Sequence, residues 1–403
     1  MNGDVVITGL GTLGPHGVGT PALADGLSQG RPLFVPMDLA QGFHRSGSAR
    51  LAGRVDPSGL KPWLDPLKVR RFSAPSKMAV VAARLALEDA GIERAELAGR
   101  DVAVSLGTAF GPNEITVKLL DQARETGPES ASPFFFMESV ANAHAGQIAL
   151  DSQLRGANAT IVQREASALL AVAQGLTYLE SERCELALVG CVEEIAPVTH
   201  AMLDRFRALS AGDSELGRTF DADRDGFVAS DGATVLVLEH EERARARGAP
   251  IRGKILAAIR ANDPSATASN WGDGHAHLAA ALRRGLRRSG IERERIDRIV
   301  SGANGSRQGD RVEGLHLREV FGAELPPILA PKATTGEYGG GFLAAAVLAL
   351  DNLDFGPTPG FERVDPELGI RPHDGRRLPD ARCLLVSSLA AGGAAAWLLL
   401  GRA

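Results

Sequence analysis

Short apolar runs alternate with longer, helically periodic segments along most of the chain. The apolar runs predict buried strands, because strands covered on both faces carry few polar positions. They lie at 5–8, 102–105, 156–162, 186–190, 233–239, 251–259, 296–300, 383–388 and 394–400. Apolar residues spaced at i, i+3, i+4 and i+7 predict helices. These lie at 76–90, 165–180, 277–289, 311–321 and 341–353.

Strands that alternate with helices predict an α/β protein with largely parallel sheets covered on both faces. A Gly-rich turn is predicted at 9–15, and the charged stretch 241–247 is predicted to be a solvated connection. The strand and helix pattern restarts after that stretch. We therefore predict a duplicated, layered α/β fold with two similar halves, 1–250 and 251–403.

The composition narrows the possible classes of protein. The 403 residues are 44% hydrophobic, enough for a large core, and include 47 Gly, which favour close backbone packing. The net charge of −5 argues against a nucleic-acid partner, which requires a clustered basic face. Three cysteines, Cys184, Cys191 and Cys383, cannot form a disulfide framework, so we expect the reducing cytoplasm. We expect no membrane partner, because no apolar run is long enough to span a bilayer and no signal peptide is recognisable.

Three short motifs resemble ligand-binding sites but lack features that those sites require. The glycines at 9–14 have the spacing of a dinucleotide-binding turn, but Pro15 follows and no amphipathic helix opens there. Segment 221–226 resembles the start of a calcium loop, yet its twelfth position is Gly232 where a Glu is required. The histidines at 275–277 have no Cys near them. We therefore expect neither a cofactor nor a bound metal.

Several segments spread over nearly the whole chain together resemble the beta-ketoacyl synthase (condensing enzyme) family. They are VVITGLGTLGPHG at 5–17, SPFF at 132–135, NAHAG at 142–146, RGAN at 155–158, RTFDADRDGFV at 218–228 and KATTG at 332–336. The resemblance implies a thiolase-like fold, with two similar halves in an α-β-α-β-α arrangement. It also implies that the family's activity, decarboxylative Claisen condensation on acyl carrier protein, depends on one Cys and two His.

This chain departs from the family at each of those catalytic positions. Glu165 stands where the nucleophilic Cys is expected, at a strand-to-helix junction, and Asn304 lies in the segment expected to hold the first His. Glu337 stands at the place of the second His, and Ala391 at that of a pocket-gating Phe. A carboxylate attacking a thioester would give an anhydride, a less stable acyl store. Without either His, the enolate formed on decarboxylation loses its main stabilising donors.

Within the family, this pattern resembles the chain length factor branch, the non-catalytic partner of an active ketosynthase in type II polyketide and polyene pathways. The resemblance implies a heterodimer in which the ketosynthase holds the Cys and both His, while this chain shapes the acyl tunnel and sets product length. It also implies acyl carrier protein as a partner. Two alternatives stay open: a stand-alone decarboxylase of malonyl-acyl carrier protein, and a scaffold homodimer.

The fold implied by the resemblance would bring Glu165, Asn304 and Glu337 together. Two buried carboxylates repel each other, so they cannot both ionise cheaply without a cation or a shared proton. We predict that Lys332 or Arg164 pairs with one of them and holds the site closed. Two unpaired carboxylates open to a channel would instead favour an acid–base role. The plainer alternative is that these polar residues only fill a vacated site.

Four consecutive apolar residues form a second candidate feature. They are Phe134, Phe135, Phe136 and Met137, in a chain with only 14 Phe. Core packing is one interpretation. The other is that part of the cluster crosses the subunit interface and lines the partner's tunnel, where bulk would shorten the product.

A basic segment forms a third candidate feature. Lys68, Arg70 and Arg71 lie where ketosynthases often receive the acidic acyl carrier protein. Such a triplet is either a docking site or ordinary solvated surface. Binding through exposed charges would weaken as salt is added, because exposed ion pairs are screened.

Overall fold

The computed structural model describes the whole chain except residues 1–2, 43, 45–48, 213 and 269. One large sheet runs through the molecule, and a two-stranded ribbon, β3 (Phe34–Pro36) with β4 (Leu51–Gly53), lies outside it. The first-half strands of the large sheet are β1 (Val5–Gly14), β2 (Gly17–Val18), β5 (Val102–Gly107), β6 (Asn158–Ile161), β7 (Leu186–Glu193) and β8 (Gly232–His240). The second-half strands are β9 (Gly253–Asn262), β10 (Arg298–Ser301), β11 (Ile328–Leu329), β12 (Cys383–Leu389) and β13 (Ala394–Gly401).

The two halves repeat one strand arrangement. The first half has the order β6-β5-β7-β8-β1, and the second has the order β11-β10-β12-β13-β9. In each half the first two neighbouring pairs are parallel and the last two are antiparallel. Antiparallel pairing of β1 with β9 joins the halves. The predicted duplication is therefore confirmed, whereas the boundary at residue 250 stays a prediction.

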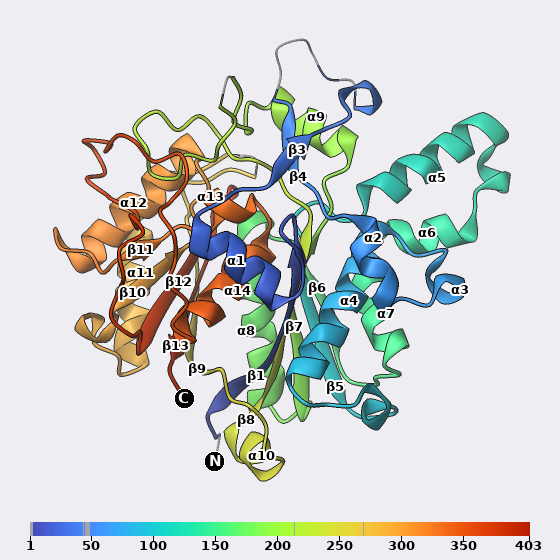
Figure 1. Ribbon diagram of the computed structural model, residues 1–403, viewed down its shortest axis with the longest axis horizontal. Coiled ribbons are helices and arrows are strands. Elements are labelled where there is room, and N and C mark those ends of the chain that lie inside the picture. Colours follow the sequence, from blue (N-terminus) through green and yellow to red (C-terminus); the bar gives the residue numbers. More distant parts are fainter. Residues whose placement is uncertain (1–2, 43, 45–48, 213, 269) are drawn as a thin grey trace.

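Helices form layers on both sides of the strands (Figure 1). Those of the first half are α1 (Thr20–Gln29), α2 (Pro57–Leu60), α3 (Pro66–Val69), α4 (Ala74–Asp89), α5 (Asn113–Thr126), α6 (Pro133–Ser139), α7 (Ala143–Asp151), α8 (Ser167–Glu180), α9 (Pro197–Arg205) and α10 (Glu241–Ala246). Those of the second half are α11 (His275–Arg288), α12 (Arg307–Phe321), α13 (Lys332–Thr335) and α14 (Gly339–Leu350). No helix in the described part of the chain is long and apolar enough to cross a membrane.

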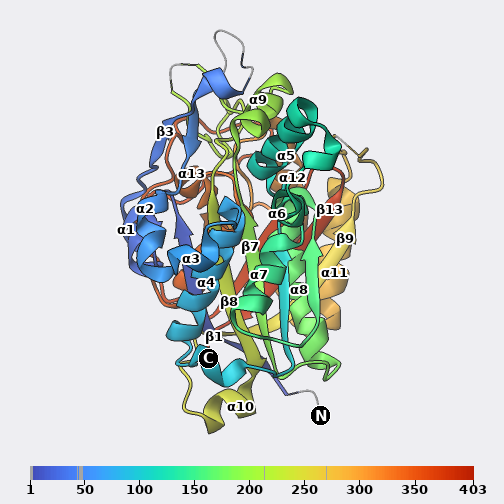
Figure 2. The same ribbon diagram turned by 90° about the vertical axis from the view of Figure 1, so that its right-hand side faces the viewer.

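The central layer consists of α8 and α14, which pack on each other and on strands of both halves. Every residue of α14 is buried, so this helix carries no polar face. Each helix connects equivalent strands: α8 leads from β6 to β7, and α14 leads from β11 to β12. Figure 2 views the molecule from the side that carries α5, α6 and α7. The helix α7 packs on α4, whereas α8 packs on β5, β7 and α14. The N-termini of α8 and α14 therefore occupy equivalent places in the duplicated fold.

Three predictions were wrong. The sheet is not largely parallel, because six of its ten strand pairings are antiparallel. The glycines at 9–14 form no turn but continue β1, because α4 packs directly on this strand. A Cβ at Gly9 would lie 2.1 Å from the Ala86 carbonyl oxygen, and one at Gly11 would lie 2.0 Å from that of Ala82. These two glycines therefore permit close packing of a helix on a strand. The charged stretch predicted as a connection contains α10, whose arginines follow glutamates in the favourable order.

Candidate functional site

Glu165 and Glu337 occupy equivalent positions in the two halves. Glu165 lies two residues before α8, in a short 3-10 turn (Arg164–Ala166), and Glu337 lies two residues before α14. Both helices point their N-termini toward the site. The unpaired N–H groups and the positive end of the dipole favour negative charge at these places. The duplicated fold therefore builds one polar site from two carboxylates.

Lys332 forms a buried ion pair with Glu337. Its Nζ lies 2.8 Å from Oε1 and 2.9 Å from Oε2 of that carboxylate, and the lysine side chain is 0% exposed. The same Nζ lies 4.8 Å from the centre of the Phe342 ring, over its face. The predicted pairing of a cation with one of the two carboxylates is thus present here.

Asn304 is a second hydrogen-bonding partner of the Glu337 carboxylate. Its Nδ2 donates to Oε2 of Glu337 at 2.5 Å, and its Oδ1 accepts from the Ser306 backbone N–H at 2.9 Å. The Asp310 carboxylate in turn accepts from the backbone N–H groups of Asn304 and Gly305, both at 3.1 Å. Burial raises the pKa of Asp310 to about 6. These bonds fix both the loop and the amide, so Asn304 has little freedom to turn toward a substrate.

Glu165 lies beside this group but is held separately. It is half-buried, and its Oε2 accepts from the Ala391 backbone N–H at 3.2 Å. Its own carbonyl oxygen accepts from Ser388 Oγ at 2.8 Å. Burial raises the pKa of Glu165 to about 7, the charge of Glu337 raises it further, and Lys332 opposes the change. Close to neutral pH this carboxyl therefore exists in both protonation states.

Arg164 does not join the site. Its side chain is exposed, and its Nη2 donates to the Ala268 carbonyl oxygen at 3.1 Å. Its backbone has φ of 49°, the left-handed region, which turns the chain sharply ahead of α8. Of the two predicted cations, only Lys332 pairs with a carboxylate among the described residues.

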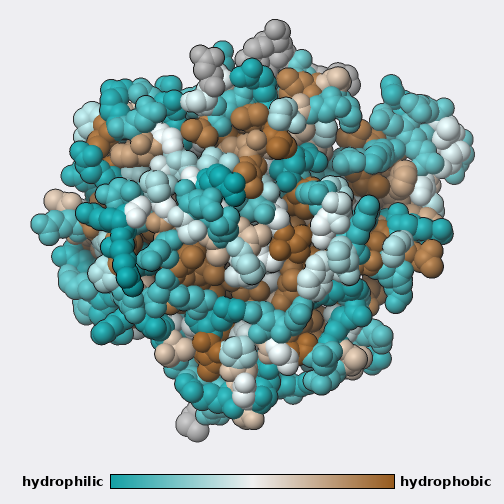
Figure 3. Space-filling view, viewed as in Figure 1, coloured by the Kyte–Doolittle hydropathy of each residue, from teal (hydrophilic) through white to brown (hydrophobic). Residues whose placement is uncertain are grey.

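The phenylalanine cluster lies in α6, at the surface of the protein. The exposed fractions are 40% for Phe134, 63% for Phe136 and 56% for Met137, while Phe135 is half-buried. Brown apolar surface is visible at the right of Figure 3, where α5 and α6 lie. Core packing is therefore excluded for the three exposed side chains. We call Phe134, Phe135, Phe136 and Met137 the α6 patch.

The basic segment adjoins the α6 patch. The Arg71 guanidinium lies 3.6 Å from the centre of the Phe134 ring, over its face. Lys68 and Arg70 are exposed in the same short stretch around α3. The two surface features found separately in the sequence are thus continuous in space. Their roles stay predictions.

Two family models cover most of the chain. Residues 2–244 match "Beta-ketoacyl synthase, N-terminal domain", and residues 253–358 match "Beta-ketoacyl synthase, C-terminal domain". The chain belongs to the beta-ketoacyl synthase family. A curated relative is the tetracenomycin polyketide synthase ketoacyl synthase alpha subunit of Streptomyces glaucescens, which is 29% identical over an alignment of 388 residues. The alignment covers 91% of this chain and 89% of that protein.

Solved ketosynthase structures share the fold over its full length. The ishigamide ketosynthase/chain length factor matches with a TM-score of 0.90 and 28% identity, covering 100% of both chains. A type II polyketide synthase acyl-carrier protein in complex with its ketosynthase bound to the hexaketide matches with a TM-score of 0.87 and 21% identity, again over 100% of both chains. At that identity the second match shows the fold alone. The thiolase-like fold implied by the sequence is confirmed.

Sequence reasoning missed one buried acid, Glu313, near the beta-ketoacyl synthase site. Glu313, one turn after Asp310 on α12, accepts from Ser301 Oγ at 2.6 Å, and burial raises its pKa to about 7. The available signal was the spacing of Asp310 and Glu313, which lie three residues apart on the buried side of α12. Cys191 ends close to Gly339 at the start of α14, and burial raises the pKa of its thiol above the usual range. It is not a reactive thiolate.

The site therefore differs chemically from the site with one Cys and two His that the family resemblance implies. Lys332 and Glu337 neutralise each other, and both polar ends of Asn304 are already engaged. Glu165 offers a carboxyl at the place where the family resemblance expects a thiol. The arrangement holds two helix N-termini together and supplies no sulfur or imidazole at the three corresponding positions.

Proposed function

We propose that this protein is a non-catalytic, chain length factor-like subunit that pairs with an active ketosynthase in type II polyketide or polyene biosynthesis. The observation that carries the proposal is the buried Lys332–Glu337 ion pair beside Asn304 and Glu165. These four side chains lie at or beside the positions where the family resemblance expects a nucleophilic Cys and two His, which supports a role without bond formation. The ishigamide ketosynthase/chain length factor match supports the same assignment.

A partner chain would cover the face that carries the α6 patch. Exposed apolar groups of this size on a soluble protein are typical of interaction sites. In the described residues β6 pairs with β5 on one side only, so it is an edge strand open to another chain. The helix α7 contacts both α6 and β6, which places edge and patch on one continuous region. We propose this region as the heterodimer interface.

Acyl carrier protein is the second proposed partner. The solved type II complex with an acyl-carrier protein shows that a protein of this fold can receive one. Lys68, Arg70 and Arg71 give this chain an exposed basic segment next to the proposed interface. A negatively charged carrier would dock there through exposed charges, and its affinity would fall as salt rises.

One observation favours a different activity. A carboxyl whose pKa is about 7 can give and take a proton at neutral pH, so Glu165 suits an acid–base role in malonyl decarboxylation. However, the other carboxylate is engaged by Lys332, and no free donor faces a developing enolate among the residues described at the site. Release of carbon dioxide from malonyl-acyl carrier protein by the purified protein would support this rival.

Co-expression tests the main proposal. The chain is produced with a ketosynthase that has an intact Cys and both His, and the copurified complex is assayed for product length. We expect a stable complex, and a longer product when Phe134 or Phe136 is changed to Ala. If the chain forms a homodimer and does not copurify with the ketosynthase, the proposed heterodimer is contradicted. Unchanged product length in both variants would contradict the tunnel role of the α6 patch.

A further inference from the structure

The helix α6 buries a charged residue and exposes apolar ones. Of its seven residues, all of which the structure describes, only Glu138 is buried, at 3% exposed, whereas Phe134, Phe136 and Met137 lie at the surface. A carboxylate is costly to bury unless its hydrogen bonds are satisfied. Burial of apolar side chains therefore contributes little to the attachment of α6, and the contacts of Glu138 decide how this helix is held.

Donors from α4 and α7 surround the Glu138 carboxylate. Its Oε2 accepts from the Ser73 backbone N–H at 2.9 Å, from Ser73 Oγ at 2.8 Å and from Ser76 Oγ at 2.7 Å. Its Oε1 accepts from Gln147 Nε2 at 2.7 Å. Ser73 is the N-cap of α4, and Gln147 lies on α7. The carboxylate thus links α6 to α7 and to the N-terminus of α4, where the helix dipole favours a negative charge.

The same contacts join α6 to the end of the basic segment. Arg71 is two residues before Ser73, and its guanidinium lies 3.6 Å from the centre of the Phe134 ring. The stretch 71–73 is therefore tied to α6 twice, once through that ring and once through the Glu138 carboxylate. The position of the α6 patch relative to the basic segment depends on both ties.

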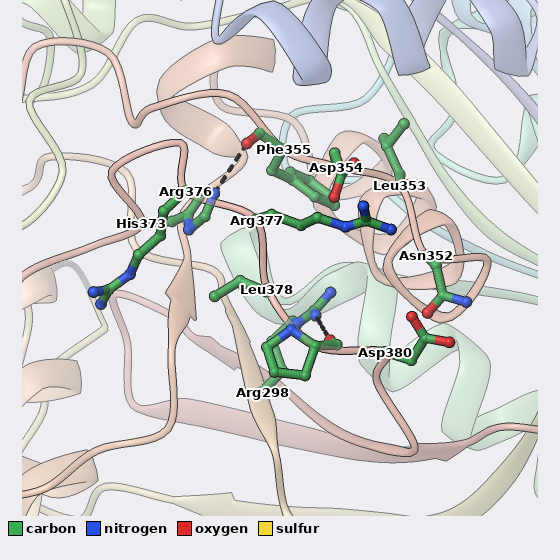
Figure 4. A pocket seen from close by; sticks show the side chains of 11 residues that line it. Arg298, Asn352, Leu353, Asp354, Phe355, His373, Arg376, Arg377, Leu378 and Asp380 are labelled. Carbon is green, nitrogen blue, oxygen red and sulfur yellow. Dashed lines mark hydrogen bonds between the residues drawn. The ribbon is translucent and has the colours of Figure 1, made fainter.

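A buried charge in the second half provides a comparison. Arg298, at the start of β10, is 4% exposed, and its Nη2 donates to the Pro379 carbonyl oxygen at 2.6 Å (Figure 4). Asp354 and Asp380 line the same pocket, whose cavity of about 30 Å³ has room for little more than a water molecule. This charge joins two stretches of the same half. Glu138 differs from it, because the helix that Glu138 holds exposes an apolar patch.

We propose that Glu138 is a positioning residue for the partner surface: its carboxylate fixes α6 so that the α6 patch and Arg71 meet the ketosynthase in one arrangement. This inference rests on the proposed function. A helix of seven residues is too short to keep its form without tertiary contacts. A surface that is ordered before binding avoids the entropic cost of ordering it in the complex. Loss of the Glu138 contacts should therefore loosen α6 and weaken the complex, although Glu138 itself is buried.

Hydrogen exchange of the free protein tests whether Glu138 fixes α6. Glu138→Gln keeps the size of the side chain but replaces an acceptor oxygen by an amide donor, and the milder Ser76→Ala removes one donor to the carboxylate. We expect the amides of 133–139 to exchange at least tenfold faster in Glu138→Gln and at least twofold faster in Ser76→Ala. The amides of the fully buried α14 should keep their rates. Unchanged exchange in α6, or an equal increase in α14, would overturn the proposal.

Affinity for a ketosynthase with an intact Cys and both His, measured by surface plasmon resonance, tests the purpose of that position. We expect Glu138→Gln to bind at least fivefold more weakly than the wild type. The matched control is Asp221→Asn, which should change the affinity less than twofold. Asp221 is also a buried carboxylate, and it accepts from the backbone N–H groups of Asp223, Glu362 and Arg363.

Two results would overturn the role of Glu138: equal affinities of the wild type and Glu138→Gln, or an equal loss of affinity in Asp221→Asn. A wild type that does not bind the ketosynthase would instead contradict the proposed function. The exchange rates of the free protein would still decide whether Glu138 fixes α6.

Discussion

Single residues decide what this beta-ketoacyl synthase site can do. Lys332 is completely buried and reaches a carboxylate five residues along the chain, while Asn304 satisfies the same carboxylate from the other side. A buried pair of this kind is worth little as net stability but is costly to break, because the remaining charge is left without a partner. The Lys332–Glu337 pair therefore persists because neither buried charge can lose its partner without a large cost in free energy.

The first prediction concerns this ion pair. Lys332→Met should lower the free energy of unfolding by about 3–5 kcal/mol, because Glu337 is then left charged and buried. The double variant Lys332→Met with Glu337→Met should recover most of that loss. Chemical denaturation measures both. As a control, Lys118→Met in the exposed Lys118–Glu114 pair should cost less than about 1 kcal/mol. Full stability in Lys332→Met would show that the pair is dispensable.

The second prediction concerns Glu165 and pH. Its folded-state pKa of about 7 is above the ordinary value of 4.5, so the folded protein binds this proton more tightly than the unfolded chain. That contribution to stability is complete below pH 4.5 and is lost as pH rises through 7. The wild type should therefore lose up to about 3 kcal/mol more than Glu165→Gln between pH 4.5 and 8.

Denaturation of both proteins across this pH range measures the difference. Other buried carboxyls with raised pKa values, such as Glu193 and Glu313, are common to both proteins and cancel. Parallel stability curves for the two proteins would mean that Glu165 titrates normally. The position would then offer no acid–base group near neutral pH.

Among the secondary-structure elements, the α6 patch carries the proposed partner contact. Exposed Phe136 and Met137 contribute little to the stability of the isolated chain but offer apolar area to a partner. Met137→Lys should change the unfolding free energy by less than about 0.5 kcal/mol and sharply reduce copurification with the ketosynthase, because it places a charge in the proposed contact. Leu256→Lys, at an exposed position of β9 in the other half, is the matched control and should copurify normally. Equal copurification of both variants would move the interface elsewhere.

How far sequence predicts an element depends on what holds it together. The strongly periodic α4 and the apolar strands β12 and β13 were predicted nearly to their ends, because burial alone specifies them. The strand predicted at 5–8 was shorter than β1. Gly9 and Gly11 belong to the strand because they let a helix pack closely on it, and that contact joins segments distant in sequence. The surface position of Phe134 was likewise undecided, since four apolar residues suit either a core or an interface.

The site was predicted in part for the same reason. The convergence of Glu165, Asn304 and Glu337 followed from the family resemblance, and a cation beside one carboxylate followed from electrostatics. The choice of Lys332 over Arg164 depended on one backbone turn with positive φ, which directs the arginine outward. No periodicity encodes that turn.

The whole molecule is a duplicated fold whose two central helices bring their N-termini to one site. In this protein that site contains a neutral ion pair and a protonatable carboxyl, and the surface around α6 is apolar and basic. These features together support the proposal of a subunit that depends on a partner for bond formation. The partner would contribute the reacting groups, and this chain would help to shape the acyl tunnel.

Incubation of the purified protein with acyl- and malonyl-acyl carrier protein tests the central claim most directly. Products are followed by mass spectrometry with and without a ketosynthase that has an intact Cys and both His. We predict that no chain elongation occurs with this protein alone and that elongation occurs when the ketosynthase is added. A lengthened acyl chain formed by the isolated protein would contradict the account.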